Sequence, residues 1–272
     1  MIPTDLFRYC SNECTLSEVL SGLTWIENKV TINDATLEGT VGPGTKIEGL
    51  RGRIPVKLFQ SLVTSSKFDG VFKNTYFDAF IGLQGMNTNN LIRGIMYPPD
   101  LLKYNSALTD IPNLFYGTTI PVGVDINTDL FFKLPSLKVI NNLWSNCKFD
   151  SRSYNSSEIF SGIYSQFSFI DLFKYNTKIT NASGLFAVIN TGLGKGLLII
   201  ESALLEAAQN ISNISNMFFY CTSLKGAVPL FYSGTYTALS NVSGYLIGVP
   251  ENNITNRSDV GTRLRPSDWS QI

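Results

Sequence analysis

Side chains that could carry catalysis or bind a metal are sparse in this 272-residue sequence, and histidine is absent altogether. Without histidine the chain cannot form a Ser-His-Asp or Cys-His catalytic group, and it lacks the commonest protein metal ligand. The four cysteines are Cys10, Cys14, Cys147 and Cys221. Cys10 and Cys14 form one CxxxC pair, but no second pair completes the four ligands that structural zinc requires. We expect no catalytic residue, no metal and no cofactor.

One glycine-rich stretch and several carboxylates have residue types that occur in other kinds of functional site. A phosphate-binding loop needs lysine directly after glycine, whereas residues 44–46 read Gly-Thr-Lys, so a turn is expected there. A glycosidase needs two facing carboxylates. Asp129 and Asp171 precede apolar doublets and are expected to cap helices, while Asp150 and Glu158 are expected in solvent. A glycan-degrading enzyme is therefore the weakest of the functions considered.

Composition and charge exclude two further classes of partner. The 21 basic residues are balanced by 21 acidic ones, and charged residues make up only 15% of the chain. Nucleic-acid binders usually carry a basic excess, because phosphate neutralisation drives their affinity, so nucleic acid is not expected. The longest apolar run, residues 196–200, is stopped by Glu201 and is too short to span a bilayer. We expect no membrane insertion.

An apolar pattern recurs along the chain. Counted from a starting leucine, apolar residues fall at offsets 7, 10, 13 and 14, the last two forming a doublet. Four gapless copies start at Leu101, Leu130, Leu172 and Leu204, and weaker copies start at Leu6, Leu58 and Leu230. Intervals of 26 to 52 residues separate the starting leucines, so the connecting loops vary in length. Repeats of this kind predict stacked turns that share one continuous core.

The residues within one copy suggest its local structure. Pro, Asp or Asn commonly precedes the first doublet, which favours the start of a short helical turn. Residues 135–140 and 222–229 then alternate apolar and polar side chains, as a short strand does. Asn, Ser, Thr and Gly cluster between copies, as in turns. Each copy is therefore predicted to hold one short helical turn and one short strand.

Three regions depart from the repeat. Residues 31–53 alternate around a Gly-Pro-Gly sequence and are expected to form a β-hairpin-like insertion at the edge of the stack. Residues 73–95 are expected to form a longer loop or a degraded repeat. We divide the chain into a repeat domain over 1–250, irregular over 24–96, and a C-terminal cap or linker over 251–272.

The stretch NISNISNMFFYCTSLKGAVPLF, residues 210–231, resembles the BspA-like bacterial surface leucine-rich repeats. In that family a cysteine follows four residues after the first member of a Met-Phe or Leu-Phe doublet. Cys10, Cys147 and Cys221 fit this frame, and Asn105 and Asn176 stand at the matching place. The resemblance implies an α/β fold, an irregular leucine-rich-repeat solenoid of short helical turns and short strands. It also implies contact with protein or glycan rather than catalysis.

This resemblance gives Cys221 a structural role. A position that alternates between cysteine and asparagine suits a tight inner turn, where cysteine acts as a buried apolar filler. Asparagine at the same place is expected to bond to its own local backbone. We predict that Cys221 is buried beneath the turn formed by Met217 and Phe218.

Aromatic side chains in polar surroundings are the candidate interaction surface, because such residues are enriched at interfaces. They are Tyr154, Tyr164, Tyr232, Tyr236 and Trp269. We expect a non-enzymatic structural or interaction module of a large surface assembly, most simply a tail-associated bacteriophage virion protein. The start MIPTDLF lacks a secretory signal and resembles the middle of a repeat, which favours the virion.

The alternative is a secreted or surface bacterial adhesin that binds host protein or glycan. In either case the expected partners are other proteins of the assembly or a host surface protein or glycan. Oligomerisation within the assembly is compatible with the repeat.

Overall fold

A computed structural model of the chain describes thirteen segments and one further residue. These are residues 16–17, 24–26, 50–51, 58–74, 76–78, 101–120, 130–149, 165–169, 172–189, 196–200, 203–222, 224–231, 234–256 and 259.

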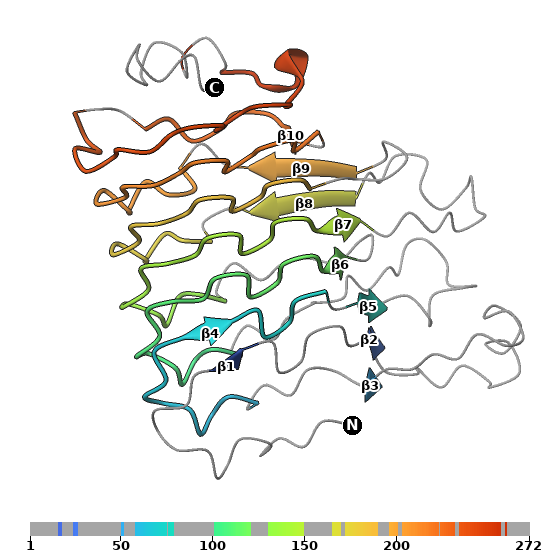
Figure 1. Cartoon of the computed structure of the whole chain (residues 1–272), viewed down its shortest axis with the longest axis vertical. Coiled ribbons are helices and arrows are strands. Elements are labelled where there is room, and N and C mark those ends of the chain that lie inside the picture. The colour runs from blue at the N-terminus through green and yellow to red at the C-terminus, as the bar shows by residue number, and fades with distance from the viewer. Residues whose placement is uncertain are drawn as a thin grey trace, which may run out of the picture.

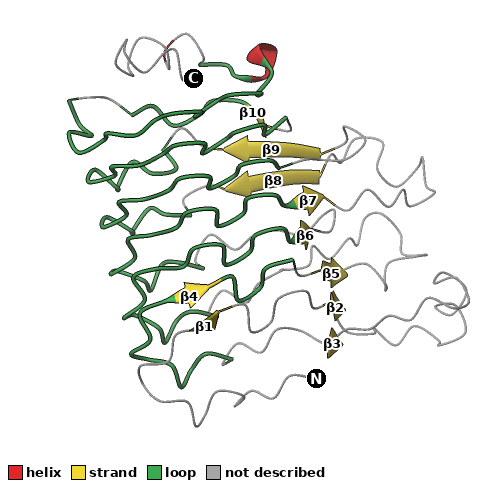
Figure 2. Ribbon diagram, viewed as in Figure 1, coloured by secondary structure: helices red, strands yellow, loops and turns green. Residues whose placement is uncertain are grey.

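The described residues contain ten short strands and a single 3-10 helix. The strands are β1 (Leu16–Ser17), β2 (Thr24–Ile26), β3 (Leu50–Arg51), β4 (Phe68–Asp69), β5 (Tyr76–Asp78), β6 (Thr119–Ile120), β7 (Lys148–Phe149), β8 (Ser165–Phe169), β9 (Gly196–Ile200) and β10 (Leu224–Lys225), and the helix is η3 (Glu251–Asn253). Figure 2 shows that turns and loops make up most of the remaining described chain.

All pairings between these strands are parallel. β1 pairs with β4, and two larger sheets have the orders β3-β2-β5-β6-β7 and β10-β9-β8. Isolated parallel bridges continue the pattern through Lys67, Asp110, Val139, Asn181, Asn213 and Asn241. From Lys67 to Asn241 successive passes of the chain therefore lie side by side in sequence order, whereas β3 lies beyond β2, as Figure 1 shows.

Each of these six bridge residues begins an eight-residue segment that we call an arc. The arcs are residues 67–74, 110–117, 139–146, 181–188, 213–220 and 241–248. The N–H groups at arc positions 2, 4, 6 and 8 donate to the carbonyls at positions 1, 3, 5 and 7 of the next arc, in all five junctions. In one junction, for example, Ala182, Gly184, Phe186 and Val188 donate to Asn213, Ser215, Met217 and Phe219 at 2.6–2.9 Å.

The backbone winds because two positions of every arc are left-handed. Positions 4 and 8 have φ between 50° and 78° in all six arcs. Glycine or asparagine occupies ten of these twelve places, as expected of the two residues that tolerate this conformation best. The exceptions are Val188, at φ 56°, and Tyr220, at φ 50°.

Two of the glycines are required by space as well as by φ. A Cβ added to Gly117 would collide with Oδ1 of Asn74, and one added to Gly184 would collide with Oδ1 of Asn142. Each of these asparagines holds the same arc position in the preceding arc. Glycine is not the general rule beyond an asparagine, because Asn142 lies beyond Asn113, to whose Oδ1 it donates at 3.3 Å, and Val188 lies beyond Asn146.

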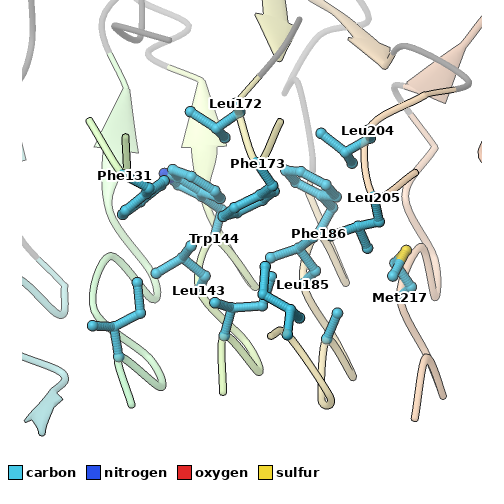
Figure 3. Packing of buried hydrophobic residues seen from close by; sticks show 14 of the residues in the cluster. Phe131, Leu143, Trp144, Leu172, Phe173, Leu185, Phe186, Leu204, Leu205 and Met217 are labelled. Atoms are coloured by element: carbon cyan, nitrogen blue, oxygen red, sulfur yellow. The ribbon is translucent and has the colours of Figure 1, made fainter. Parts of the chain in front are cut away.

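The core is a column of side chains from arc positions 2, 5 and 6. Four near-parallel ring pairs run along it with centroids 5.6–5.8 Å apart: Phe72–Phe115, Phe115–Trp144, Trp144–Phe186 and Phe186–Phe218. A second stack, Phe131 on Phe173 at 5.3 Å, comes from the doublets at the start of each copy. Figure 3 shows four of these rings, Phe131, Trp144, Phe173 and Phe186, among the neighbouring leucines. In the four gapless copies, every apolar residue at the predicted offsets is buried.

Local structure differs from the sequence-based expectation in two respects. The residues after the starting leucines form hydrogen-bonded turns, such as Leu62 N–H to Phe59 O, rather than helix. Within residues 135–140 only Val139 forms β-bridges to neighbouring turns, with Asp110 and Asn181. Within residues 222–229, by contrast, the expected short strand is present as β10. The winding of the arcs explains this, because left-handed residues interrupt any longer strand.

The predicted hairpin near 31–53 lies mostly outside the described residues. Its described part, β3, pairs in parallel with β2 on the side away from β5. A hairpin would make an antiparallel pair. Because this pair is parallel, Leu50 and Arg51 instead extend the sheet by one more parallel strand. In the predicted cap, Ile254 bridges Gly226 in parallel, and beyond residue 256 only Asp259 is described.

Val188 provides a test of the left-handed positions. The preceding arc has asparagine, Asn146, at the position of Val188. Replacing Val188 with asparagine should raise the free energy of unfolding by about 1 kcal/mol, because a β-branched side chain is strained at φ 56°. Urea denaturation measures the change. The contrasting variant, Gly117→Val, should be destabilised, because it places a β-branched side chain at φ 66°. A destabilised Val188→Asn variant would contradict this account of the winding.

Candidate interaction surface

Tyr236, one of the five aromatic residues predicted to form the interaction surface, is buried, so that prediction is wrong for this residue. Only 6% of its surface is exposed, and its ring packs edge-on against Phe231 with centroids 5.1 Å apart. Its hydroxyl donates to the carbonyl of Leu205 at 3.5 Å. Burial, and then the negative charge of Glu206, raise the pKa of the Tyr236 phenol. The other four, Tyr154, Tyr164, Tyr232 and Trp269, lie outside the described residues.

Exposed aromatic side chains occur instead one or two residues after the doublets that start two of the copies. Phe132 follows the doublet at 130–131 and is 39% exposed, and Tyr175 follows the doublet at 172–173 and is 54% exposed. Their rings meet edge-on with centroids 4.7 Å apart, across two successive turns. Tyr104, after the doublet at 101–102, is half-buried.

A lysine accompanies each of these aromatic residues. The ammonium of Lys133 lies 4.2 Å from the centre of the Phe132 ring, and Lys103 and Lys174 lie 5.9 and 6.0 Å from the rings of Tyr104 and Tyr175. At exposed sites such cation–π contacts are worth about 0.5–1 kcal/mol each. We call this set the aromatic–lysine row: Lys103, Tyr104, Phe132, Lys133, Lys174 and Tyr175.

Two buried asparagines hold the turns that carry the row. The Nδ2 group of Asn105 donates to the carbonyls of Phe59 and Leu62 at 3.0 and 2.8 Å. Asn176 Nδ2 donates likewise to Phe131 and Leu134, at 3.1 and 2.9 Å. The partners lie 42–46 residues earlier, one turn down the stack, so the expected bonding to local backbone is wrong. Each asparagine side chain therefore links the turn that carries its neighbouring row residues to a turn of an earlier copy.

Cys147 and Cys221 do not share the position of Asn105 and Asn176, contrary to the sequence interpretation, and Cys10 lies outside the described residues. Asn105 and Asn176 follow the doublets that start a copy, whereas Cys147 and Cys221 directly follow an arc. Cys147 Sγ donates to the carbonyl of Phe115 at 3.3 Å. The Oγ1 of Thr118, at the same place one turn earlier, donates to Phe72 at 3.2 Å. Thr118 and Cys147 therefore both bond to the preceding turn from this place, whereas buried Ile189 and Val249 hold it after two other arcs without a side-chain donor.

The prediction that Cys221 is buried is confirmed. None of its surface is exposed, and its N–H donates to the carbonyl of Phe218 at 2.9 Å, closing the turn over the doublet. Cys147 is equally buried, and burial raises the pKa of its thiol far above the ordinary value. A buried neutral thiol is a poor nucleophile, so Cys147 fits a structural role.

In the part of the chain that the structure describes, no three or more of histidine, cysteine, aspartate and glutamate gather where they could hold a metal ion. Over the same residues, no helix has the length and apolar character needed to cross a membrane.

The aromatic–lysine row has a signal in the sequence that the prediction did not use. Lysine and an aromatic residue occur together directly after three successive doublets, as Lys103-Tyr104, Phe132-Lys133 and Lys174-Tyr175. The sequence interpretation sought aromatic residues in polar segments between copies. It therefore overlooked those that flank the most apolar positions.

Asn176 should contribute measurably to stability. The copy that starts at Leu130 has leucine, Leu134, at the place of Asn176. Replacing Asn176 with leucine removes the bonds from its side chain to the carbonyls of Phe131 and Leu134, which each keep one backbone donor, so the free energy of unfolding should fall by about 1–3 kcal/mol. Urea titration measures the loss. The neighbouring exposed Thr177→Ala change should stay within about 0.5 kcal/mol. Equal effects of the two substitutions would show that the inter-turn bonds are unimportant.

The two described thiols should be protected from reagents. In the folded chain Cys147 and Cys221 should resist iodoacetamide, since both are fully buried, and both should react once urea unfolds the protein. Peptide mapping by mass spectrometry separates them from Cys10 and Cys14. Rapid modification of Cys221 in native buffer would mean that the turn after Phe218 is open.

Comparison with known proteins gives no match. No protein-family model matches the chain, and neither the curated proteins nor the solved structures include a significant match to it. A functional proposal must therefore rest on the arcs, the inter-turn hydrogen bonds and the aromatic–lysine row.

Proposed function

We propose that this chain is a non-catalytic structural and interaction module, built as an irregular leucine-rich-repeat solenoid within a large surface assembly. The assembly that we propose is a bacteriophage virion, with the chain associated with the tail. The observation that carries the proposal is the uninterrupted set of hydrogen bonds between the six arcs.

Those bonds support a scaffold role for a physical reason. Every arc is bonded to its neighbours through four N–H groups, and the doublets fill the space between turns with buried rings and leucines. The backbone conformation is fixed by Gly and Asn at the left-handed positions. Side chains on the outside of the turns can then vary without loss of the core, as in repeat proteins that present extended binding surfaces.

The aromatic–lysine row is the contact surface that we propose on this scaffold. On three successive turns an aromatic ring and an ammonium group occupy the two residues after the doublet, in reversed order at Phe132-Lys133. The side-chain amides of Asn105 and Asn176 bond two of those turns to earlier ones. A rigid aromatic surface loses little conformational entropy on binding. Aromatic residues are also enriched among those that dominate interface energies. The partner is another protein of the assembly or a host surface protein or glycan.

The row equally favours the second candidate function, a secreted or cell-surface adhesin, because contact with a host needs the same chemistry. The location of the chain distinguishes the two. Mass spectrometry of purified virions should recover the chain as a stoichiometric component. If protease treatment of intact, uninfected bacterial cells releases peptides of this chain instead, the chain is a cell-surface adhesin and not a virion protein.

The aromatic–lysine row can be tested directly with exposed residues. The double variant Phe132→Ser, Tyr175→Ser should weaken co-sedimentation of the labelled full chain with intact host cells or purified tails by about tenfold or more, because two interface rings are lost. The matched control is Tyr220→Ser, which removes a ring that is 53% exposed but lies outside the row. Equal binding by the double variant and the wild type would show that the aromatic–lysine row is not the contact surface.

A further inference from the structure

After the last arc the chain makes one more pass along the sheet β10-β9-β8. In this pass Ile254 bridges Gly226, the residue that follows β10, in parallel. The two residues stand at the same place after their arcs, which end at residues 248 and 220. Among the described residues no later pass forms a β-bridge to this one, so its bridge lies on one side only. We call residues 250–256 the strap.

The strap places little apolar surface in the core. Ile254 is its one buried residue, and the three residues of helix η3 are not buried. In Figure 2 this helix lies beyond β10, at the C-terminal end of the described stack. Segments with few buried apolar contacts open at a lower free energy than the core does. The polar contacts of the strap therefore decide how firmly it is held.

The first polar attachment is made by the backbone. The N–H of Gly226 donates to the carbonyl of Asn253 at 2.9 Å, and the N–H of Thr255 donates to the carbonyl of Gly226 at 3.0 Å. A longer bond of 3.4 Å runs from Asn253 Nδ2 to the carbonyl of Thr222. These bonds follow the sheet and include no residue of an arc.

The second attachment is made by the side chain of Asn256. Its Oδ1 accepts from the N–H of Val228 at 3.0 Å, and its Nδ2 donates to the carbonyl of Val228 at 2.9 Å. One amide thus bonds both backbone polar groups of a fully buried residue, with the donor and acceptor that a peptide group would offer. In the part of the chain that the structure describes, no other group bonds them, so losing this amide is costly.

We propose that the strap is a conformational device that opens as one unit while the arcs stay bonded, and that the Asn256 amide holds it closed. Opening frees the backbone groups of Gly226 and Val228 at the edge of the sheet. The arcs keep their places, because the bonds between them do not involve the strap. The proposal goes beyond the proposed function, because it concerns the end of the stack and not the aromatic–lysine row.

Amide-resolved hydrogen exchange of the full-length chain, with and without the Asn256→Ala substitution, tests the proposal. In the variant the amides of Gly226 and Thr255 should exchange about tenfold faster or more, because the strap opens more often. Both amides bond to backbone carbonyls that the substitution leaves in place, so they report opening of the whole strap. The amide of Val228 loses its acceptor directly and is not diagnostic.

Two controls accompany this variant. The amides of Ala182 and Phe186, which bond to the next arc at 2.9 Å, should keep their wild-type exchange rates. The matched substitution is Asn252→Ala, which shortens an exposed asparagine of the strap and should leave the exchange of Gly226 and Thr255 unchanged.

Three results would overturn the proposal. Unchanged exchange at Gly226 and Thr255 in Asn256→Ala would show that the strap stays closed without the amide. Equally accelerated exchange at Ala182 and Phe186 would show that the strap does not open separately from the arcs. The same acceleration in Asn252→Ala would show that the Asn256 amide is not what holds the strap. None of these results bears on binding by the aromatic–lysine row, so the proposed function and this inference fail separately.

Discussion

The whole described stack depends on one constraint, the left-handed backbone at two positions of every arc. It points the N–H groups at positions 2, 4, 6 and 8 toward the next turn while the chain still curves back on itself. Only residues that tolerate positive φ can hold those places cheaply, which explains why Gly and Asn recur there. The asparagines and glycines of adjacent arcs then fit one another, as Asn142 and Gly184 do. Backbone conformation, rather than strand propensity, sets the architecture.

The core follows from that backbone. Once the arcs are in register, the same positions of successive turns lie one above another, and the rings of Phe115, Trp144 and Phe186 stack because their doublets coincide. Loops of different length between arcs do not disturb this register. Intervals between bridge residues range from 28, from Asn213 to Asn241, to 43, from Lys67 to Asp110. Each turn buries its doublets mainly against the two turns next to it.

The sequence predicted the parts of the structure that depend on local periodicity. Offsets of 7, 10, 13 and 14 residues identified side chains that are buried in all four gapless copies. Cys221 is also buried, as its position after the Met217-Phe218 doublet predicted. The failures involve partners a full turn away. Asn176 bonds to a carbonyl 45 residues earlier, a distance that varies with loop length and leaves no fixed spacing to find. Tyr236 has polar neighbours in sequence but is covered by Phe231, which no local pattern indicates.

The prevailing direction of the bonds between turns has an electrical consequence. At each junction four N–H groups point toward the following turn, whereas only two point back, as those of Ser212 and Asn213 do toward the carbonyl of Thr180. The four dipoles outnumber the two opposed ones, so a net dipole remains along the stack, with the N–H end at the last turn. Turns of the same backbone shape thus give a molecule with two unlike poles. The pole at the last arc is the partially positive one.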